Sequence, residues 1–281
     1  MSLLQILILA IVQGAAELLP ISSSAHVIVA EKLMGLDPTA PQMTLLLVML
    51  HTGTMFAVIV YFWKSWRADY FSSMSSFRTN ALLVIIATAL TGVVAVALLQ
   101  VIKRVVGHNS PDFEIEVLFG NARLISVALG ATGLLIIASS RVPQRTPRDF
   151  TPRGAAWVGA VQGLCLPFRG FSRSGATIST ALFLGVSRRR AEEFSFALAV
   201  VLTPPVIAKE AYRLYKAVSP SSAATPAQLL HFVTPSLLGM ALSFLAGLAA
   251  LRWLSRWLEQ GRWHYFGVYC IAAGVIVRFI G

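Results

Sequence analysis

Charged residues are scarce in this chain. Asp, Glu, Lys and Arg together make up 12% of its 281 residues, whereas 56% are apolar. A soluble domain carries about 25% charged residues, so the composition excludes an ordinary soluble fold. Acidic residues are the scarcer sign, 12 against 23 Lys and Arg, and the net charge is +11. The basic residues cluster between apolar runs and form no tract with interleaved aromatics, so no nucleic-acid partner is expected.

Cysteine is nearly absent as well. Cys165 and Cys270 are the two cysteines of the chain, and both lie in apolar surroundings. Two such distant cysteines do not form a disulfide framework, and a free cysteine usually packs as a small buried hydrophobe. The sequence therefore predicts no structural disulfide.

Long apolar runs take the place of charge. A helix of about 20 mostly apolar residues spans a bilayer. The predicted spans are 42–63, 80–102, 119–138, 193–214, 233–254 and 263–280. Pro204-Pro205 predicts a kink in the fourth. We therefore expect an all-α polytopic membrane protein with about six transmembrane helices, in which residues 1–281 form a single integral membrane domain in contact with membrane lipids.

Two apolar segments, 3–35 and 155–187, are interrupted in the same way. In the first, Val12-Gln13-Gly14 precedes Pro20 and Ser22-Ser23-Ser24; in the second, Val161-Gln162-Gly163 precedes Pro167 and Ser172-Arg173-Ser174. Paired interrupted segments are typical of inverted-repeat membrane proteins with a site near the membrane midplane. We expect two re-entrant helix pairs, in repeats of approximately residues 1–115 and 118–281. A shorter echo, Trp63-Lys64-Ser65 and Trp253-Leu254-Ser255, follows them.

Loop charges predict the orientation, because cytoplasmic loops are rich in Lys and Arg. The expected cytoplasmic segments are 64–79, 139–154, Arg188-Arg189-Arg190 and 252–262, and the expected outer ones are 103–118 and 217–231. Both termini then lie outside, and the two broken segments enter from opposite faces. Lys209, Arg213 and Lys216 fit poorly, since they fall at the outer end of their span.

The first break carries a carboxylate, hydroxyls and an imidazole. Gln13 and Glu17 are four residues apart and share a helix face. Ser22 is placed as the N-cap of the next helix. Ser22 and Ser23 precede His26 by four and three residues, so a hydroxyl can meet the imidazole. An ionisable group at membrane depth costs about 2.5 to 3.5 kcal/mol on insertion scales and is functional by default.

The second break carries an arginine. Arg173 and Thr177 share one face of a helix that restarts after Gly170 and Ser172. The guanidinium fork suits phosphate oxygens, and a helix N-terminus favours an anion. The two breaks together supply a hydroxyl, an imidazole, a carboxylate and a guanidinium. That set suits phosphoryl transfer, in which positioning and charge stabilisation supply most of the catalysis.

Structural roles compete with these functional ones. Capping is an alternative role for Ser22 and Ser24. Glu17 and Arg173 could instead neutralise one another as a buried pair. His51 lies within a predicted span with no partner evident in the sequence, and its role stays open.

These residues resemble a known family. Gln13-Gly14-Ala15-Ala16-Glu17 with Leu19 to His26, and Gly170 to Thr177 with Gly185 to Arg188, resemble the two signatures of the bacterial undecaprenyl-pyrophosphate phosphatase (bacitracin-resistance) family. The resemblance extends over essentially the whole chain. It implies a multi-pass enzyme of the bacterial cell membrane, with its site open to the outer face. The implied reaction converts the polyprenyl lipid undecaprenyl pyrophosphate to the monophosphate carrier used for peptidoglycan synthesis.

The resemblance also implies roles for individual residues. The catalytic residues that the resemblance implies are Glu17, Ser23, His26 and Arg173, with Gln13 at a position where the family carries Glu or Gln. From the residues of the two breaks themselves, the expected substrate-binding residues are Gln13, Ser22, Ser24, Arg169, Ser172, Ser174 and Thr177. Gln13 stands where better-known members carry Glu, and Phe168-Arg169 precedes Gly170 where Pro is typical.

Several alternatives stay open at this point. Glu17 is a candidate ligand for a divalent cation, Mg²⁺ or Ca²⁺, and whether one is required is undecided. The nucleophile is Ser23, His26 or water, and the chain is a monomer or a homodimer. A transporter or flippase of undecaprenyl phosphate without hydrolysis is the alternative function.

Overall fold

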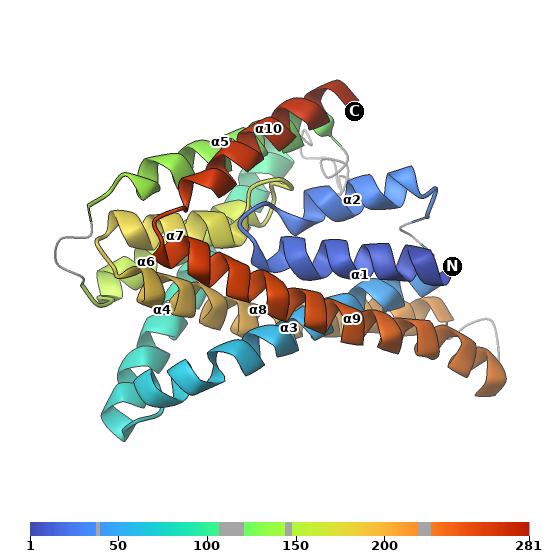
Figure 1. The fold of residues 1–281 in the computed structure, drawn as a ribbon, viewed down its shortest axis with the longest axis horizontal. Helices are drawn as coiled ribbons and strands as arrows, with labels where there is room; N and C mark the ends of the chain where they lie inside the picture. Colours follow the sequence, from blue (N-terminus) through green and yellow to red (C-terminus); the bar gives the residue numbers. More distant parts are fainter. Residues whose placement is uncertain (38–39, 107–120, 144–147, 219–225, 281) are drawn as a thin grey trace. The chain divides into compact units, whose positions relative to one another are not determined.

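The computed structural model describes residues 1–37, 40–106, 121–143, 148–218 and 226–280. Over these residues the chain is helical, and an isolated bridge between Arg148 and Val186 is its only β pairing. The described helices are α1 (Leu3–Leu18), α2 (Ser23–Leu33), α3 (Pro41–Asp69), α4 (Met74–Val105), α5 (Ala122–Ser140), α6 (Pro152–Cys165), α7 (Arg173–Phe183), α8 (Arg188–Val218), α9 (Pro226–Glu259) and α10 (His264–Ile280) (Figure 1). The all-α prediction is confirmed.

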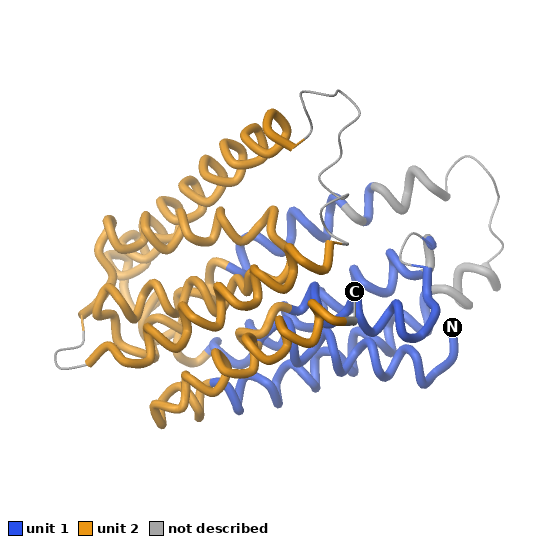
Figure 2. The backbone as a smooth tube through the Cα atoms, turned by 90° about the horizontal axis from the view of Figure 1, so that it is seen from above, with its two compact units in different colours: residues 1–18, 23–63, 199–254 blue, residues 19–22, 64–198, 255–281 orange. Residues whose placement is uncertain are grey.

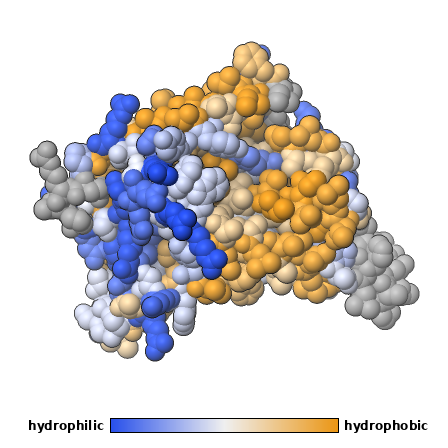
Figure 3. Space-filling model, in the orientation of Figure 1, coloured by the Kyte–Doolittle hydropathy of each residue, from blue (hydrophilic) through white to orange (hydrophobic). Residues whose placement is uncertain are grey.

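Five of the described helices, α3, α4, α5, α8 and α9, contain stretches long and apolar enough to cross a membrane. Helix α10 is apolar but shorter, so the sixth predicted span, 263–280, is a short helix rather than one of full length. Pro204 and Pro205 do not end α8, which continues to Val218. Figure 3 shows broad areas of hydrophobic side chains on the surface, as a polytopic membrane protein requires.

Parts of the predicted loops lie outside the described residues. Residues 107–120 fall within and just after the predicted outer segment 103–118. Residues 144–147 fall within the predicted cytoplasmic segment 139–154, and residues 219–225 fall within the predicted outer segment 217–231. The side chains of Arg213 and Lys216, which fitted the loop charges poorly, also lie outside the described part. The orientation of the chain in the membrane stays a prediction.

Both broken segments are helix–turn–helix units, as predicted. Helix α1 ends at Leu18 and α2 begins at Ser23, whereas α6 ends at Cys165 and α7 begins at Arg173. Each turn contains a residue with left-handed backbone, Ser22 at φ 69° and Gly170 at φ 98°. A Cβ atom at Gly170 would lie 2.6 Å from the carbonyl oxygen of Ile125. Only glycine fits that position, because both the backbone and the space exclude a side chain.

The described chain forms two compact units, shown in blue and orange in Figure 2. Unit 1 comprises residues 1–18, 23–63 and 199–254, and unit 2 comprises 19–22, 64–198 and 255–281. Each unit draws on both halves of the chain. The units therefore do not follow the predicted repeats, which stay a prediction.

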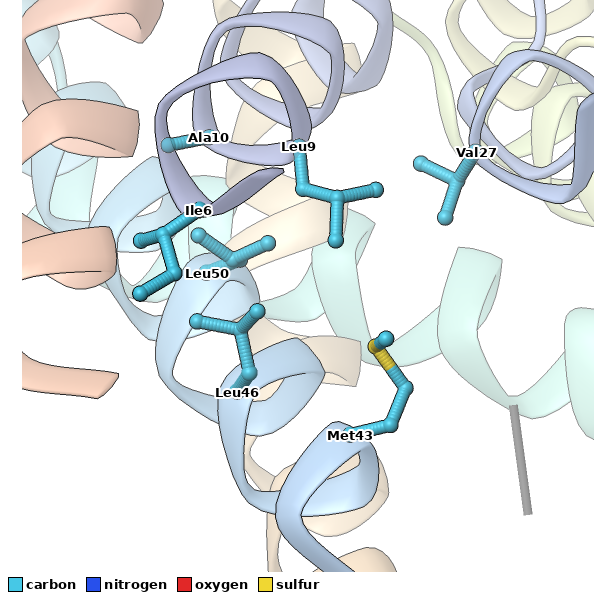
Figure 4. Packing of buried hydrophobic residues seen from close by; sticks show 7 residues of the cluster. All are labelled: Ile6, Leu9, Ala10, Val27, Met43, Leu46 and Leu50. Atoms are coloured by element: carbon cyan, nitrogen blue, oxygen red, sulfur yellow. The ribbon is translucent and has the colours of Figure 1, made fainter. Parts of the chain in front are cut away.

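The core of unit 1 fixes the first helix pair on α3. Apolar side chains from α1, α2 and α3 pack together in Figure 4, and this cluster consists of Ile6, Leu9, Ala10, Val27, Met43, Leu46 and Leu50. The hydroxyl of Ser243 on α9 donates to the carbonyl oxygen of Leu50 at 3.0 Å. The polar residues of α1 and α2 are thus held on a packed apolar base.

Close helix contacts hold unit 2 together. Helix α5 meets α10 at Gly133 and Gly267. A Cβ atom added at Gly133 would lie 2.6 Å from the carbonyl oxygen of Gly267, and one added at Gly267 would lie 2.7 Å from the carbonyl oxygen of Gly133. Between α4 and α6, the Thr91 hydroxyl bonds the carbonyl oxygen of Gly159 at 2.9 Å, and the Gln162 amide donates to Thr91 at 3.0 Å. Small residues and interhelical hydrogen bonds are the usual means of packing membrane helices.

Two consecutive glutamates of α8 accept hydrogen bonds from the echoed serines. Ser65 of Trp63-Lys64-Ser65 donates to Glu193, and Ser255 of Trp253-Leu254-Ser255 donates to Glu192. Glu193 is also paired with two arginines of its own helix, Arg189 at 2.7 Å and Arg190 at 3.3 Å. The short sequence echo therefore marks matching contacts on one helix.

Candidate active site

Glu17 is the centre of a polar cluster in unit 1. The hydroxyl of Ser23 donates to its Oε2 atom at 2.7 Å, and the amide of Gln13 donates to the same atom at 3.1 Å. The shared face of Gln13 and Glu17 is thereby confirmed. The turn at residues 19–22 reverses the chain, so the first residue of α2 returns to the last turn of α1. A serine with a carboxylate beside its hydroxyl is the arrangement of an activated nucleophile and its base.

His51 of α3 joins this cluster, which the sequence did not predict. Its Nε2 atom lies 3.8 Å from Oε2 of Glu17, and its Nδ1 atom lies 2.8 Å from the carbonyl oxygen of Leu47. The side chains of His51 and Glu17 are 38% and 20% exposed. The only sequence signal was a titratable residue in an otherwise uncharged span, since no spacing rule relates positions 17 and 51.

The other predicted residues of the first break lie on or next to the start of α2. Ser22 is buried and immediately precedes the helix, where a cap was predicted, while Ser24 and His26 are half-buried in its first turn. The single hydroxyl hydrogen of Ser23 is used by Glu17. The structure therefore pairs Ser23 with the carboxylate, and the predicted meeting of a hydroxyl with His26 stays a prediction.

Helix α7 begins at the predicted cap of the second break. The side chain of Ser172 accepts a hydrogen bond from the amide of Gly175 at 3.2 Å, and its own amide donates to the Thr132 hydroxyl on α5 at 3.0 Å. Ser172 and Ser174 are both buried. The hydroxyl of Ser172 is thus used in capping, and contact of either serine with substrate stays a prediction.

Arg173 is the first residue of α7 and lies against α8. Its Nη1 atom donates to the carbonyl oxygen of Ser195 at 3.4 Å, and its guanidinium carbon lies 5.9 Å from the centre of the Phe196 ring. The buried hydroxyl of Thr177 is 2.6 Å from that of Ser195 and donates to the carbonyl oxygen of Arg173 at 2.8 Å. Thr177 therefore ties the arginine-bearing turn to α8, a role that the sequence did not predict, and Ser195 and Phe196 had no recognisable signal.

The turn of the first break lies against the start of α7, within unit 2. The Ser174 hydroxyl donates to the carbonyl oxygen of Leu19 at 3.3 Å, and the Cys270 thiol donates to that of Pro20 at 3.2 Å. A Cβ atom at Gly175 would lie 3.3 Å from Pro20. The two breaks therefore adjoin through residues 19 and 20, as their repetition in the sequence suggested.

Two residue sets complete the comparison with the sequence. Arg169 is half-buried in the second break, and its contact with a phosphate stays a prediction. Cys165 and Cys270 are free and buried, which confirms that they form no disulfide. Within the described residues no group of three or more His, Cys, Asp and Glu side chains lies together as a metal cage would require.

Comparison with known proteins identifies one matching family and several relatives that share a name. Residues 6–276 match the family described as bacitracin resistance protein BacA. The chain is 60% identical over 278 residues to undecaprenyl-diphosphatase 2 of Acinetobacter baylyi, covering 99% of this chain and 98% of that protein. It is 34% identical to undecaprenyl-diphosphatase of an Anaeromyxobacter species, covering 100% and 88%, and 32% identical to that of Korarchaeum cryptofilum, covering 99% and 98%. The chain therefore belongs to the bacitracin resistance protein BacA family.

Proposed function

We propose that the protein is a membrane phosphatase that hydrolyses undecaprenyl pyrophosphate to undecaprenyl phosphate and inorganic phosphate. The observation that carries this proposal is the 2.7 Å hydrogen bond from Ser23 to Glu17, in a chain whose relatives are named undecaprenyl-diphosphatases. Transport of a lipid requires neither a nucleophile nor a base. The product would be the carrier lipid for peptidoglycan synthesis, and its recycling would confer bacitracin resistance.

Binding of the pyrophosphate is assigned to the guanidinium of Arg173 and to the first amides of α2 and α7. A helix N-terminus presents backbone N–H groups and a positive dipole end to an anion. The planar fork of donors on the Arg173 guanidinium matches the geometry of phosphate oxygens. Gln13, Ser22, Ser24 and Arg169 are assigned to orienting the phosphates.

For the chemical step, Ser23 Oγ attacks the terminal phosphorus while Glu17 accepts the hydroxyl proton. The bond from that phosphorus to the bridging oxygen breaks, and undecaprenyl phosphate leaves with the bond's electron pair. Water then attacks the phosphorus of the phosphoserine while His26 takes a proton from the water. The bond from phosphorus to Ser23 Oγ breaks, Glu17 returns its proton to that oxygen, and inorganic phosphate is released from the regenerated Ser23 side chain. In the variant of this scheme without a phosphoserine, Ser23 orients a water that attacks directly.

The residues of this site supply some of the ligands that a divalent cation would need. Glu17 supplies carboxylate oxygen and Gln13 an amide oxygen, the hard donors that Mg²⁺ and Ca²⁺ prefer, and pyrophosphate oxygens would complete the set. Such a cation would offset the charge of the phosphates. The proton transfers assigned above to Ser23, Glu17 and His26 do not depend on it.

The test is release of inorganic phosphate by the purified chain in detergent, from undecaprenyl and farnesyl pyrophosphates, with and without chelator. We expect release from the undecaprenyl substrate, and loss of it in a Glu17→Ala preparation made in parallel. Binding of the lipid without release would overturn the proposal in favour of a transporter or flippase, because detergent abolishes any gradient.

Two finer points belong to the same proposal. We place the active site on the outer face of the cell membrane, which labelling of single-cysteine variants in whole cells would test. A homodimer is the proposed assembly, and the mass of the protein in nanodiscs would decide between it and a monomer.

A further inference from the structure

Three consecutive arginines at the start of α8 hold several helix ends of unit 2 together. Arg189 pairs with Asp69 at the end of α3 at 2.9 Å, and Arg190 pairs with Asp149, just before α6, at 3.1 Å. Arg188 donates to the last carbonyl oxygen of α9 at 3.0 Å. The most basic tract of the sequence is therefore engaged within the protein, where it neutralises acidic side chains and caps a helix.

The same end of unit 2 carries further cations, which are exposed. Arg190 also donates to Asn80 in the first turns of α4 at 3.0 Å, and the indole of Trp263, just before α10, donates to Ser139 near the end of α5 at 3.1 Å. These contacts bring the remaining helix ends to the same place. We call the exposed Lys and Arg side chains on or beside these helix ends the basic end: Lys64, Arg67, Arg78, Arg141, Arg153 and Arg262.

The charge of the basic end is not neutralised by the described part of the protein. None of its six side chains forms an ion pair with another described residue. Asp69 and Asp149 are instead paired with the arginines of α8, and the exposed carboxylate of Glu259 adds one negative charge against the six. Cations gathered without counter-charges raise the local concentration of anions. An anionic partner is therefore expected at this end.

The basic end lies at the level of lipid headgroups. The apolar stretches of α3, α4, α5 and α9 each have one end here, so the cations lie where the membrane-spanning length stops. Exposed aromatic rings accompany them. Trp157, 59% exposed, lies one helical turn after Arg153 on the same face of α6, and Tyr265, 51% exposed, follows Arg262 at the start of α10. Such rings and cations together are typical of the membrane–water interface and not of a face surrounded by water.

We propose that the basic end of unit 2 binds anionic phospholipid. Its cations hold the phosphate groups, which the guanidinium fork matches in geometry, and the aromatic rings contact the glycerol and upper acyl region. The bias of Lys and Arg along the sequence predicts only how the chain is oriented in the membrane, whereas lipid binding is a property of the folded protein. The inference goes beyond the proposed function and uses none of the residues assigned to catalysis or substrate binding.

The experiment measures lipid retained by the purified full-length chain in detergent, by native mass spectrometry. Phosphatidylglycerol is the anionic probe, and phosphatidylcholine with the same acyl chains is the reference. We expect phosphatidylglycerol to bind at least about tenfold more tightly, and raising the ammonium acetate concentration to reduce this preference, because salt screens exposed charges.

Two double variants locate the binding surface. Arg141→Gln with Arg262→Gln removes two cations of the basic end, and we expect at least about a fivefold loss of phosphatidylglycerol affinity with phosphatidylcholine unchanged. Lys103→Gln with Arg104→Gln is the matched control, because it removes two exposed cations from the opposite end of α4. This control should keep the wild-type affinity for phosphatidylglycerol.

Several results would overturn the proposal. Equal retention of the two lipids by the wild type is one, and wild-type affinity in Arg141→Gln with Arg262→Gln, or an equal loss in both double variants, is another. Displacement of phosphatidylglycerol by glycerol phosphate at equal concentration would show that the surface binds free phosphate and not a lipid. If the arginine variant does not fold, as judged by size exclusion, the salt dependence of the wild type decides, and a phosphatidylglycerol affinity that salt leaves unchanged refutes the proposal.

Discussion

Replacing Gly133 with alanine should force α5 away from α10 in unit 2. The new Cβ atom would lie 2.6 Å from the carbonyl oxygen of Gly267 and 2.7 Å from a side-chain carbon of Ile271. Ordinary contact begins at 3.4 Å, so the helices must separate by about 0.8 Å. A gap of that size forfeits about a quarter to a half of the dispersion energy of each contact across it.

The expected loss of stability is about 2 kcal/mol, in the middle of the range for overpacked sites. Gly130 lies three residues earlier on the same helix and would have nothing within 4 Å of an added Cβ. Gly130→Ala is therefore the matched control, and better helix propensity should stabilise it by up to about 1 kcal/mol. Gly133 also adjoins Thr132, whose hydroxyl holds the amide of Ser172. Gly133→Ala should consequently lower phosphate release as well.

The assay uses the two free, buried cysteines of unit 2, Cys165 and Cys270, as reporters. Heating the detergent-solubilised protein with a thiol-reactive fluorophore records the temperature at which they become accessible. Gly133→Ala should unfold at least about 4 °C below the wild type, since 1 kcal/mol shifts the midpoint of a large domain by about 2–4 °C. Equal midpoints for the two alanine variants would refute the close contact between the helices.

Four further outcomes are expected. Glu17→Ala and Arg173→Ala should each lower turnover at least about a hundredfold, or about 2.7 kcal/mol, and near-normal phosphate release by either folded variant would contradict the assigned roles. Thr177→Val loses the hydrogen bonds of its hydroxyl to Ser195 on α8 and to the carbonyl oxygen of Arg173, so kcat should fall several-fold. Thr177→Ser should restore kcat, and equal kcat values for Thr177→Val and the wild type would exclude this positioning role. Glu193→Gln removes the charge facing two arginines and should destabilise the protein by about 3 kcal/mol, measured by the same thiol assay; an unchanged midpoint would argue against it. Burial raises the pKa of Tyr70 above its ordinary value, opposed by the neighbouring arginine. The neutral hydroxyl therefore stabilises the fold below pH about 10, and this contribution is lost as pH rises further. Tyr70→Phe should flatten the fall of the unfolding midpoint above that pH, and an identical fall in both proteins would count against it.

Local patterns predicted the helices and both breaks, because their causes are local. The length of an apolar run determines whether a helix can span, and Pro20 with Ser22 and Gly170 with Ser172 interrupt two of them. The pairing of Gln13 with Glu17 was predictable for the same reason, since residues four apart on a helix face each other.

Contacts between segments that are distant in the sequence could not be predicted from local patterns. His51 lies 34 positions after Glu17, and it reaches the carboxylate only because α1 and α3 pack on a shared core. Thr177 shared the predicted face with Arg173, yet its hydroxyl bonds Ser195 on α8. Whether a polar side chain meets a substrate or its own protein depends on the neighbouring helix, which spacing along the chain does not specify.

The two serine–glutamate pairs of unit 2 limit the insertions and deletions that the sequence tolerates. Ser65 and Ser255 come from opposite halves of the chain, yet their partners Glu193 and Glu192 are neighbours on α8. Deleting or inserting one residue at the start of that helix would turn both carboxylates by about 100° and break both bonds at once. The start of α8 should therefore tolerate substitutions but not insertions or deletions. Changes at Ser65 in the first half of the chain, or at Ser255 in the second, are each limited by the glutamate that the serine contacts on α8.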